Sequence, residues 1–115
     1  MSGRFQLQKS SDGQFRFRLL AGNGQLLLTG GPYPAYAAAL NGIDAVRRNA
    51  LREGAFSLTE SAAGEHFCVL RAADGQLIGQ SQPYASLYSA EQGCDAVRRN
   101  APGAALQDES ATPSA

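Results

Sequence analysis

The sequence predicts an α+β fold in which one β-β-β-α(-β) unit occurs twice in tandem. Together the two units are expected to form one pseudo-two-fold antiparallel sheet domain with two helices. The first observation behind this prediction is an internal repeat. Residues 5–50 align with 56–101 at a constant offset of 51 without a gap, and roughly 20 of the 46 aligned positions are identical. The second observation is that each repeat starts with alternating apolar and polar residues and then changes to a spacing of three to four.

Each repeat is expected to start as a three-stranded antiparallel meander. The strands of the first repeat are expected at 5–9, 15–19 and 26–28, and their counterparts in the second repeat start at 56, 66 and 77. In the second strand, period two places Phe15 and Phe17 in the core and leaves Arg16 and Arg18 in water. A two-residue type I′ turn is expected at Asn23-Gly24 and at its counterpart in the second repeat.

An amphipathic helix is expected to follow each meander. Apolar residues recur every three to four positions from Tyr36 to Ala50, and Pro34 suits the first helical position. In the second repeat the apolar stripe covers 87–101, and Ser86 is the expected N-cap.

A glycine, Gly42 or Gly93, stands in the middle of each expected helix and costs about 1 kcal/mol of helix stability relative to alanine. The expected gain is a close approach between the helix and the sheet. The repeated pairs Pro32-Tyr33 and Pro83-Tyr84 are expected to wedge the helix starts against the sheet.

The domain organisation follows from these elements. A single domain is expected over 1–106, with the first repeat at 4–53, the second at 55–106 and a disordered tail at 107–115. Residues 105–106 are a candidate for a short final strand.

Composition and charge narrow the function classes. The chain has 43% hydrophobic and 17% charged residues, which is typical of a globular protein, and it has no apolar run long enough to span a membrane. No secretory signal stands at the N-terminus, so a cytoplasmic location is expected. The net charge is zero, but residues 1–54 sum to +4 and residues 55–115 to −4. Because the domain has no basic excess, nucleic-acid binding is not the leading expectation.

Three pieces of the first repeat, 15–19, 21–25 and 41–50, resemble the repeat of the YegP-like family, and the second copy matches through 73–76 and 93–101. These are small bacterial proteins whose repeat is catalogued as a domain of unknown function. The resemblance implies a common sheet with terminal strands exchanged between units. It also implies that a two-repeat chain is a fused form of a single-repeat dimer, so a monomer is expected. The family brings no established activity, cofactor or catalytic residue, and none is assigned here.

The only histidine and the two cysteines are His66, Cys68 and Cys94. Period two places His66 and Cys68 on one strand face, and Cys94 belongs to the apolar stripe of the second helix. Packing of both cysteines as small apolar residues is the favoured interpretation. A buried disulfide and a metal or thiol site remain alternatives. All three residues depart from the family's usual pattern, which argues against a catalytic role throughout the family.

Exposed basic residues and two apolar residues on a nominally outer strand face are the candidates for a binding surface. They are Arg16, Arg18, Arg47, Arg48, Phe67, Val69, Arg98 and Arg99. The helix-end arginines also have a structural explanation, because Asp44 with Arg48 and Asp95 with Arg99 are i,i+4 pairs in a last helical turn.

The leading functional hypothesis is a non-enzymatic binding or interaction module with a protein partner at the outer sheet face. One alternative is nucleic-acid binding through the basic first repeat. A second alternative is a small metal- or thiol-dependent enzyme that uses the histidine and the two cysteines.

Overall fold

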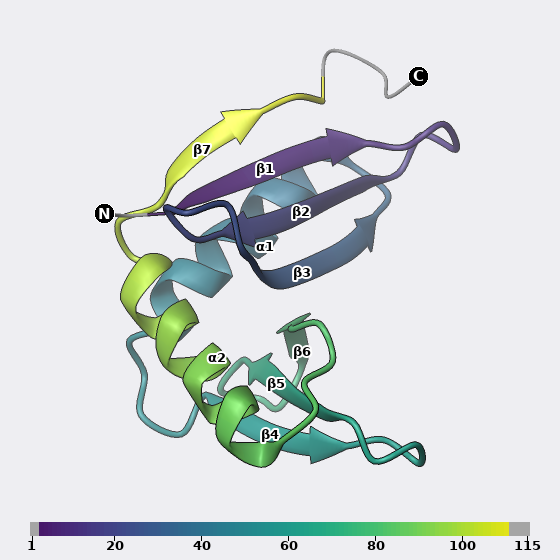
Figure 1. The fold of residues 1–115 in the computed structure, drawn as a ribbon. Coiled ribbons are helices and arrows are strands. Elements are labelled where there is room, and N and C mark those ends of the chain that lie inside the picture. The colour runs from purple at the N-terminus through teal and green to yellow at the C-terminus, as the bar shows by residue number, and fades with distance from the viewer. Residues whose placement is uncertain (1–2, 111–115) are drawn as a thin grey trace.

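The computed structural model describes residues 3–110 and shows nine elements (Figure 1). The first repeat contains β1 (Arg4–Lys9), β2 (Phe15–Leu20), β3 (Leu26–Tyr33) and α1 (Tyr36–Asn49). The second repeat contains β4 (Phe56–Glu60), β5 (His66–Arg71), β6 (Leu77–Gln80) and α2 (Leu87–Asn100), and β7 (Ala105–Asp108) follows. The predicted α+β fold with a duplicated unit is confirmed.

All the strands form one mixed sheet in the order β4-β5-β6-β3-β2-β1-β7. The repeats join where β3 pairs antiparallel with β6, with Thr29 opposite Gln80. These two residues are equivalent in the repeat, so the pseudo-two-fold axis passes between them. Leu28 and Gly79 are also equivalent, and a Cβ on Gly79 would lie only 2.7 Å from a Leu28 methyl carbon. The large residue of one repeat therefore fills the space that the glycine of the other leaves.

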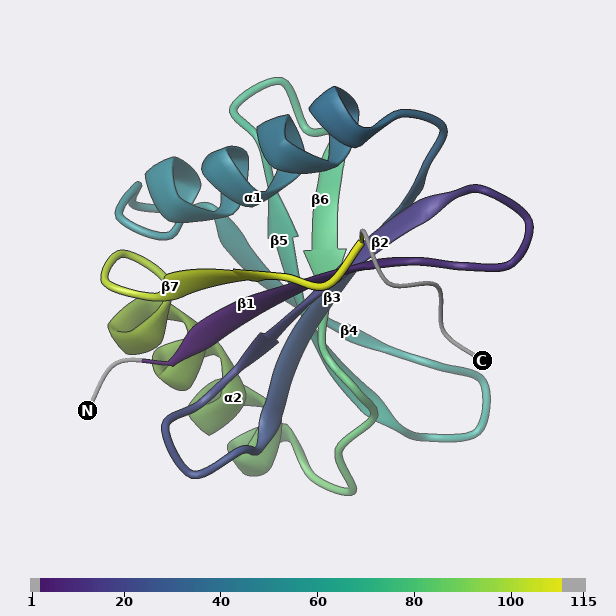
Figure 2. The same cartoon turned by 90° about the horizontal axis from the view of Figure 1, so that it is seen from above.

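Both helices pack on the same face of this twisted sheet. Strand register places Arg18, Thr29, Gln80 and Val69 in one row across β2, β3, β6 and β5, so their sequence neighbours Phe17 and Cys68 share the opposite face. The two helices cover that opposite face. In the view from above, the twist of the sheet makes β1 and β7 pass between α1 and α2 (Figure 2).

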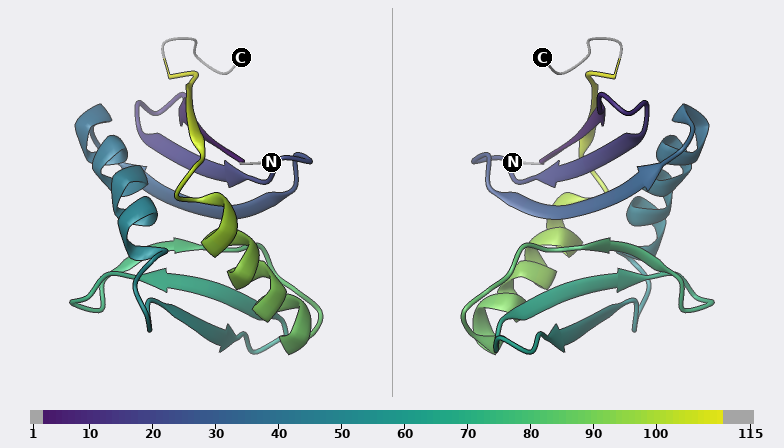
Figure 3. Two further views of the ribbon diagram at one scale, coloured as in Figure 1. Left: turned by 90° about the vertical axis from the view of Figure 1, so that its left-hand side faces the viewer. Right: turned by 90° about the vertical axis from the view of Figure 1, so that its right-hand side faces the viewer.

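The core lies between this sheet face and the helices. Its largest fully buried side chains are Phe5, Phe17, Leu7, Leu19, Leu27, Leu28, Ile43, Leu70, Val46, Val97 and Cys68. In the side views the meander β1–β3 lies above the meander β4–β6, with α1 beside the upper one and α2 beside the lower one (Figure 3).

The two repeated tyrosines pack directly on the helix glycines. A Cβ on Gly42 would overlap the Tyr33 hydroxyl, and a Cβ on Gly93 would lie 2.6 Å from the Tyr84 hydroxyl. The glycines therefore leave room for a tyrosine side chain, whereas the sequence predicted a close approach of the helix to the sheet. Burial raises the pKa of both tyrosine hydroxyls, and the Tyr84 hydroxyl is buried without a hydrogen-bond partner.

The last strand, β7, lies parallel to β1 and closes that edge of the sheet, with Leu106 opposite Phe5. The Tyr36 hydroxyl donates a hydrogen bond of 2.6 Å to Asp108. This bond and those from Ser110 lower the pKa of the Asp108 carboxyl. The strand includes residues 107 and 108, which the sequence placed in a disordered tail, and 111–115 lie outside the described residues.

The local structure differs from the sequence predictions at three points. The third strand continues past residue 28 to Tyr33 through a cis Gly31–Pro32 peptide. The turn at Asn23-Gly24 is not type I′. Gly24 has positive φ whereas Asn23 does not. The Ala21 N–H donates to the Gln25 carbonyl and the Gly24 N–H donates to the Ala21 carbonyl, which closes a three-residue loop. The first helix starts at Tyr36 rather than at Pro34. Ser86 does cap the second helix, as predicted, because its side chain accepts from the Ser89 N–H.

No helix within residues 3–110 combines the length and the apolar character needed to cross a membrane.

We expect Gly42→Ala to lower the free energy of unfolding by about 2 kcal/mol, because the added methyl group overpacks the contact with Tyr33. Helix propensity alone predicts a gain of about 1 kcal/mol, so the two explanations differ in sign. Urea denaturation measures the change. Asn41→Ala, at the exposed neighbouring position, is the control and should be neutral or slightly stabilising. A Gly42→Ala protein as stable as the parent would show that Tyr33 does not pack tightly on Gly42.

Candidate binding surfaces

The sheet face opposite the helices is basic. In the strands its outward positions hold Arg4, Arg16, Arg18 and Arg71, and three of the four are exposed while Arg4 is half-buried. Glutamine, threonine and serine side chains stand between them. The two carboxylates that the strands carry, Glu60 and Asp108, belong to the helix-covered face, because they pair with His66 and Leu7. The open face therefore concentrates positive charge that the zero net charge of the chain conceals.

Arg16 and Arg18 are exposed on this open face, as the alternation in β2 predicts. Arg18 donates a hydrogen bond of 2.7 Å to the Gln6 side chain on the neighbouring strand. Sequence analysis missed Arg4 and Arg71, which complete the face. Extending the period-two pattern by one residue at the start of β1 and at the end of β5 would have found both.

Val69 and Phe67 are less available for binding than the sequence suggested. Val69 is only 3% exposed within this chain, so it offers little surface to a partner. Phe67 is half-buried on the same face and remains a candidate.

One helix-end arginine in each repeat, Arg47 or the equivalent Arg98, lies over a phenylalanine ring. Arg47 lies over the Phe5 ring at 5.1 Å and donates to the Ala104 carbonyl just before β7. Arg98 lies over the Phe56 ring at 4.7 Å in the second repeat. Such cation–π contacts favour the structural explanation for this pair.

The other two helix-end arginines break the symmetry between the repeats. Arg48 pairs with Asp44, as predicted. Asp95 pairs with Arg98 instead of Arg99, so the predicted Asp95–Arg99 pair is wrong. Arg99 lines a hollow of about 320 Å³ between α2 and β3, together with Gln25, Tyr84 and Tyr88.

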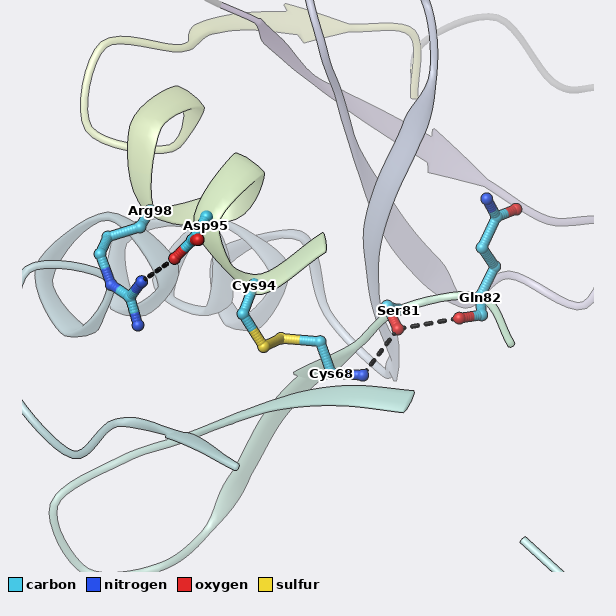
Figure 4. The surroundings of a disulfide bond; sticks show 6 residues. All are labelled: Cys68, Ser81, Gln82, Cys94, Asp95 and Arg98. Atoms are coloured by element: carbon cyan, nitrogen blue, oxygen red, sulfur yellow. Dashed lines mark hydrogen bonds and ion pairs between the residues drawn. A yellow bond between two sulfur atoms is a disulfide. The ribbon is translucent and has the colours of Figure 1, made fainter. Parts of the chain in front are cut away.

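Cys68 and Cys94 form a disulfide that ties β5 to α2, with Cα atoms 5.5 Å apart (Figure 4). Both residues are buried, at 0% and 6% exposure. The favoured prediction, two separate thiols packed in the core, is therefore wrong in its chemistry although right about burial. Alternation and helix periodicity indicated that both side chains face inward, but neither pattern fixes the distance between two sulfur atoms.

The disulfide also removes the ligands of the alternative metal site. Both sulfur atoms are bonded to each other, so His66, Cys68 and Cys94 do not form a thiolate site, and His66 lies half-buried at the bridge to Tyr84. Among residues 3–110 no three His, Cys, Asp or Glu side chains gather as metal ligands. A persistent disulfide is more typical of oxidising compartments than of the cytosol, so it does not support the expected cytoplasmic location.

The same fold and repeat occur in known proteins. The family model described as "Domain of unknown function (DUF1508)" matches residues 10–55 and again 61–108. A UPF0339 protein of Pseudomonas aeruginosa is 47% identical over 110 residues, which cover 96% of this chain and 100% of that protein. The UPF0339 protein YegP of Escherichia coli K12 is 41% identical over 108 residues, covering 94% and 98%.

Solved structures agree with the sequence relatives. The solution structure of YegP from Escherichia coli, described as a protein of unknown function, superimposes with a TM-score of 0.90 at 39% identity and covers 97% of both chains. A UPF0339 protein from Shewanella oneidensis gives a TM-score of 0.90 at 35% identity, covering 97% of this chain and 95% of that one.

We expect reduction of the Cys68–Cys94 bond to lower the free energy of unfolding by about 3 kcal/mol, since the bond closes a loop with a sequence separation of 26. Guanidinium denaturation with and without dithiothreitol measures the difference. The double variant Cys68→Ala/Cys94→Ala is the control and should not respond to the reductant. Two reactive thiols in denatured protein purified without reductant would contradict the assignment.

Proposed function

The chain belongs to the UPF0339 family, whose repeat is the domain of unknown function DUF1508, and from that premise we propose a non-enzymatic binding module whose open sheet face binds an acidic partner protein. The observation that supports this proposal most directly is the segregation of charge. The four strand arginines share the open face, whereas the strand carboxylates share the other one.

Charge segregation of this kind favours an anionic partner. A continuous patch of one sign raises the local concentration of oppositely charged partners and speeds their association. The side chains between the arginines are uncharged hydrogen-bonding groups, among them Gln6, Thr29 and Gln80. Arginine is enriched in protein interfaces, where its planar head can bind carboxylates through two hydrogen bonds.

The size of the face favours a macromolecule over a small ligand. The row of aligned positions crosses the sheet from Ser57 on β4 to Gln107 on β7. A hollow of about 420 Å³ at the junction of β3 and β6 includes Thr29 and Gln80 in its lining, but the row extends past it on both sides. The hollow beside Arg99 is lined by α2 and by the start of β3. An extended partner surface fits a face that spans the sheet.

We expect Arg16→Gln/Arg18→Gln to weaken binding of poly-L-glutamate, used as an acidic polypeptide probe, by roughly tenfold at low salt. Isothermal titration measures the affinity. Arg48→Gln/Arg99→Gln removes the same charge from the helices and is the matched control, which should retain binding. Equal loss in both double variants would mean that net charge, rather than this face, holds the probe.

Single-stranded nucleic acid is a second candidate partner, because Phe67 lies on the same face as the arginines. An aromatic ring can stack on a base while arginines contact the phosphates.

If nucleic acid is the partner, fluorescence anisotropy should show a short oligothymidylate bound with an affinity that falls steeply with salt. Phe67→Leu keeps the apolar contact but removes the ring, and should reduce that affinity by roughly tenfold. An oligothymidylate affinity no higher than that of poly-L-glutamate, unchanged by Phe67→Leu, would leave the acidic protein as the partner.

A further inference from the structure

The two edges of the sheet are not equivalent, although the repeats are. In the first repeat β1 is flanked by β2 on one side and by β7 on the other. In the second repeat β4 pairs with β5 and forms the edge of the described sheet. The pseudo-two-fold axis that relates β1 to β4 therefore relates β7 to an empty strand position beside β4 (Figure 1).

The connection between the repeats explains the empty position. The chain that leaves α2 is free to lie beside β1 of the other repeat as β7. At the offset of 51, its counterpart after α1 is the segment 54–57, and residues 56 and 57 already belong to β4. A segment cannot form β4 and also lie next to it, so joining two units in one chain removes one of the two closing strands.

Exposure at equivalent positions shows the effect of the missing strand. Phe5 and Leu7, which pair with β7, are both 0% exposed. Their counterparts are Phe56, which is half-buried, and Leu58, which is 38% exposed. Leu87 corresponds to Tyr36, which binds β7 through Asp108; their exposures of 48% and 40% are similar, so the difference is confined to the strand residues.

A hollow of about 300 Å³ lies where the missing strand would pack. It is lined by Phe56, Ser57, Leu58, Glu91, Cys94, Asp95 and Arg98. Phe56, Ser57 and Leu58 belong to the edge strand β4, and the other four residues belong to α2. The Ser57 hydroxyl on this strand is buried without a hydrogen-bond partner.

We propose that the edge of β4 binds an extended peptide segment of a partner protein, in parallel, as β7 binds to β1. An unpaired strand edge offers a row of N–H and C=O groups to such a segment, and pockets for alternate side chains supply specificity. The bound segment is expected to resemble β7, whose Leu106 and Asp108 are on the helix side of the sheet.

Differences between the two edges define the chemistry of the segment. Its residue opposite Phe56 is apolar, like Leu106 opposite Phe5. Its residue opposite Leu58 is also apolar, because Leu87 replaces the tyrosine that binds Asp108 in the first repeat. Glu91 lines the hollow, where it repels an acidic residue of the segment and favours a basic one, whereas Asp95 is already paired with Arg98.

An exchange of ion pairs accompanies binding. In the first repeat Arg47 donates to the carbonyl that precedes β7, and Asp44 pairs with Arg48. In the second repeat Arg98 pairs with Asp95 in the absence of a strand. On binding, Arg98 donates to the carbonyl at the start of the segment, and Asp95 changes its partner to Arg99.

Peptides derived from 104–110 test the proposal on the whole protein. One probe has the sequence of this chain, and the other carries Asp108→Leu and Glu109→Lys to match the β4 edge. We expect the altered peptide to bind at least roughly tenfold more tightly in an NMR titration, because it adds an apolar anchor and removes two carboxylates. Its largest amide shifts should fall in β4 and α2. Shifts in β1 and α1 instead, or no binding of either peptide, would overturn the proposal.

Matched variants separate this site from other exposed apolar residues. Leu58→Glu should weaken binding of the altered peptide by roughly tenfold, whereas Leu77→Glu, at a residue that is 52% exposed on the opposite sheet face, should leave it unchanged. Arg98→Gln should weaken it while leaving the circular dichroism spectrum unchanged. Equal effects of the two leucine variants would contradict a specific edge site.

Two further outcomes are decisive. Sedimentation that shows a dimer abolished by Leu58→Glu would assign the edge to a second copy of the chain and overturn the peptide proposal. Arg16→Gln/Arg18→Gln should bind the altered peptide normally. The two proposed sites can therefore fail independently of each other.

Discussion

The pairing of β3 with β6 is the contact on which the rest of this structure depends. It joins the repeats into one sheet, and its register determines which side chains share a face across all the strands. Arg18, Thr29, Gln80 and Val69 stand in one row because of this register. A shift of one residue at this junction would turn one half of the sheet over and place its arginines against the helices. The basic open face and the helix-covered core follow from the same few hydrogen bonds, whereas the unequal edges follow from the way the two repeats are connected.

Much of the fold was predictable because local patterns and packing agree. Phe15 to Leu19 alternate along β2, the apolar stripe of α1 recurs every three to four residues, and Ser86 caps α2 as its chemistry requires. The Asn23-Gly24 turn was mispredicted because a type I′ turn and a three-residue loop with a final glycine use the same residues. The strand β3 was predicted too short because its glycines and Pro32 are typical of loops, yet tertiary pairing with β2 keeps them extended.

The candidate sites were predicted less completely, because they depend on distances between segments far apart in the chain. Period two placed Arg16 and Arg18 outside, but only the register across β1, β2 and β5 adds Arg4 and Arg71 to the same face. Val69 has the same alternation as Arg18 and is nevertheless buried. The Cys68–Cys94 bond and the change of partner at Asp95 are likewise invisible in one repeat considered alone. The bond ties α2 to β5 in the half of the sheet that has no counterpart of β7.

The contact between Leu28 and Gly79 means that the two repeats are not interchangeable. The two residues occupy equivalent positions and meet across the pseudo-two-fold axis, one large and one without a side chain. Two copies of the first repeat would bring two leucines into a space made for one, and two copies of the second would leave a gap there. The two halves are therefore complementary at this position. Neither repeat would pack equally well against a second copy of itself without a substitution there.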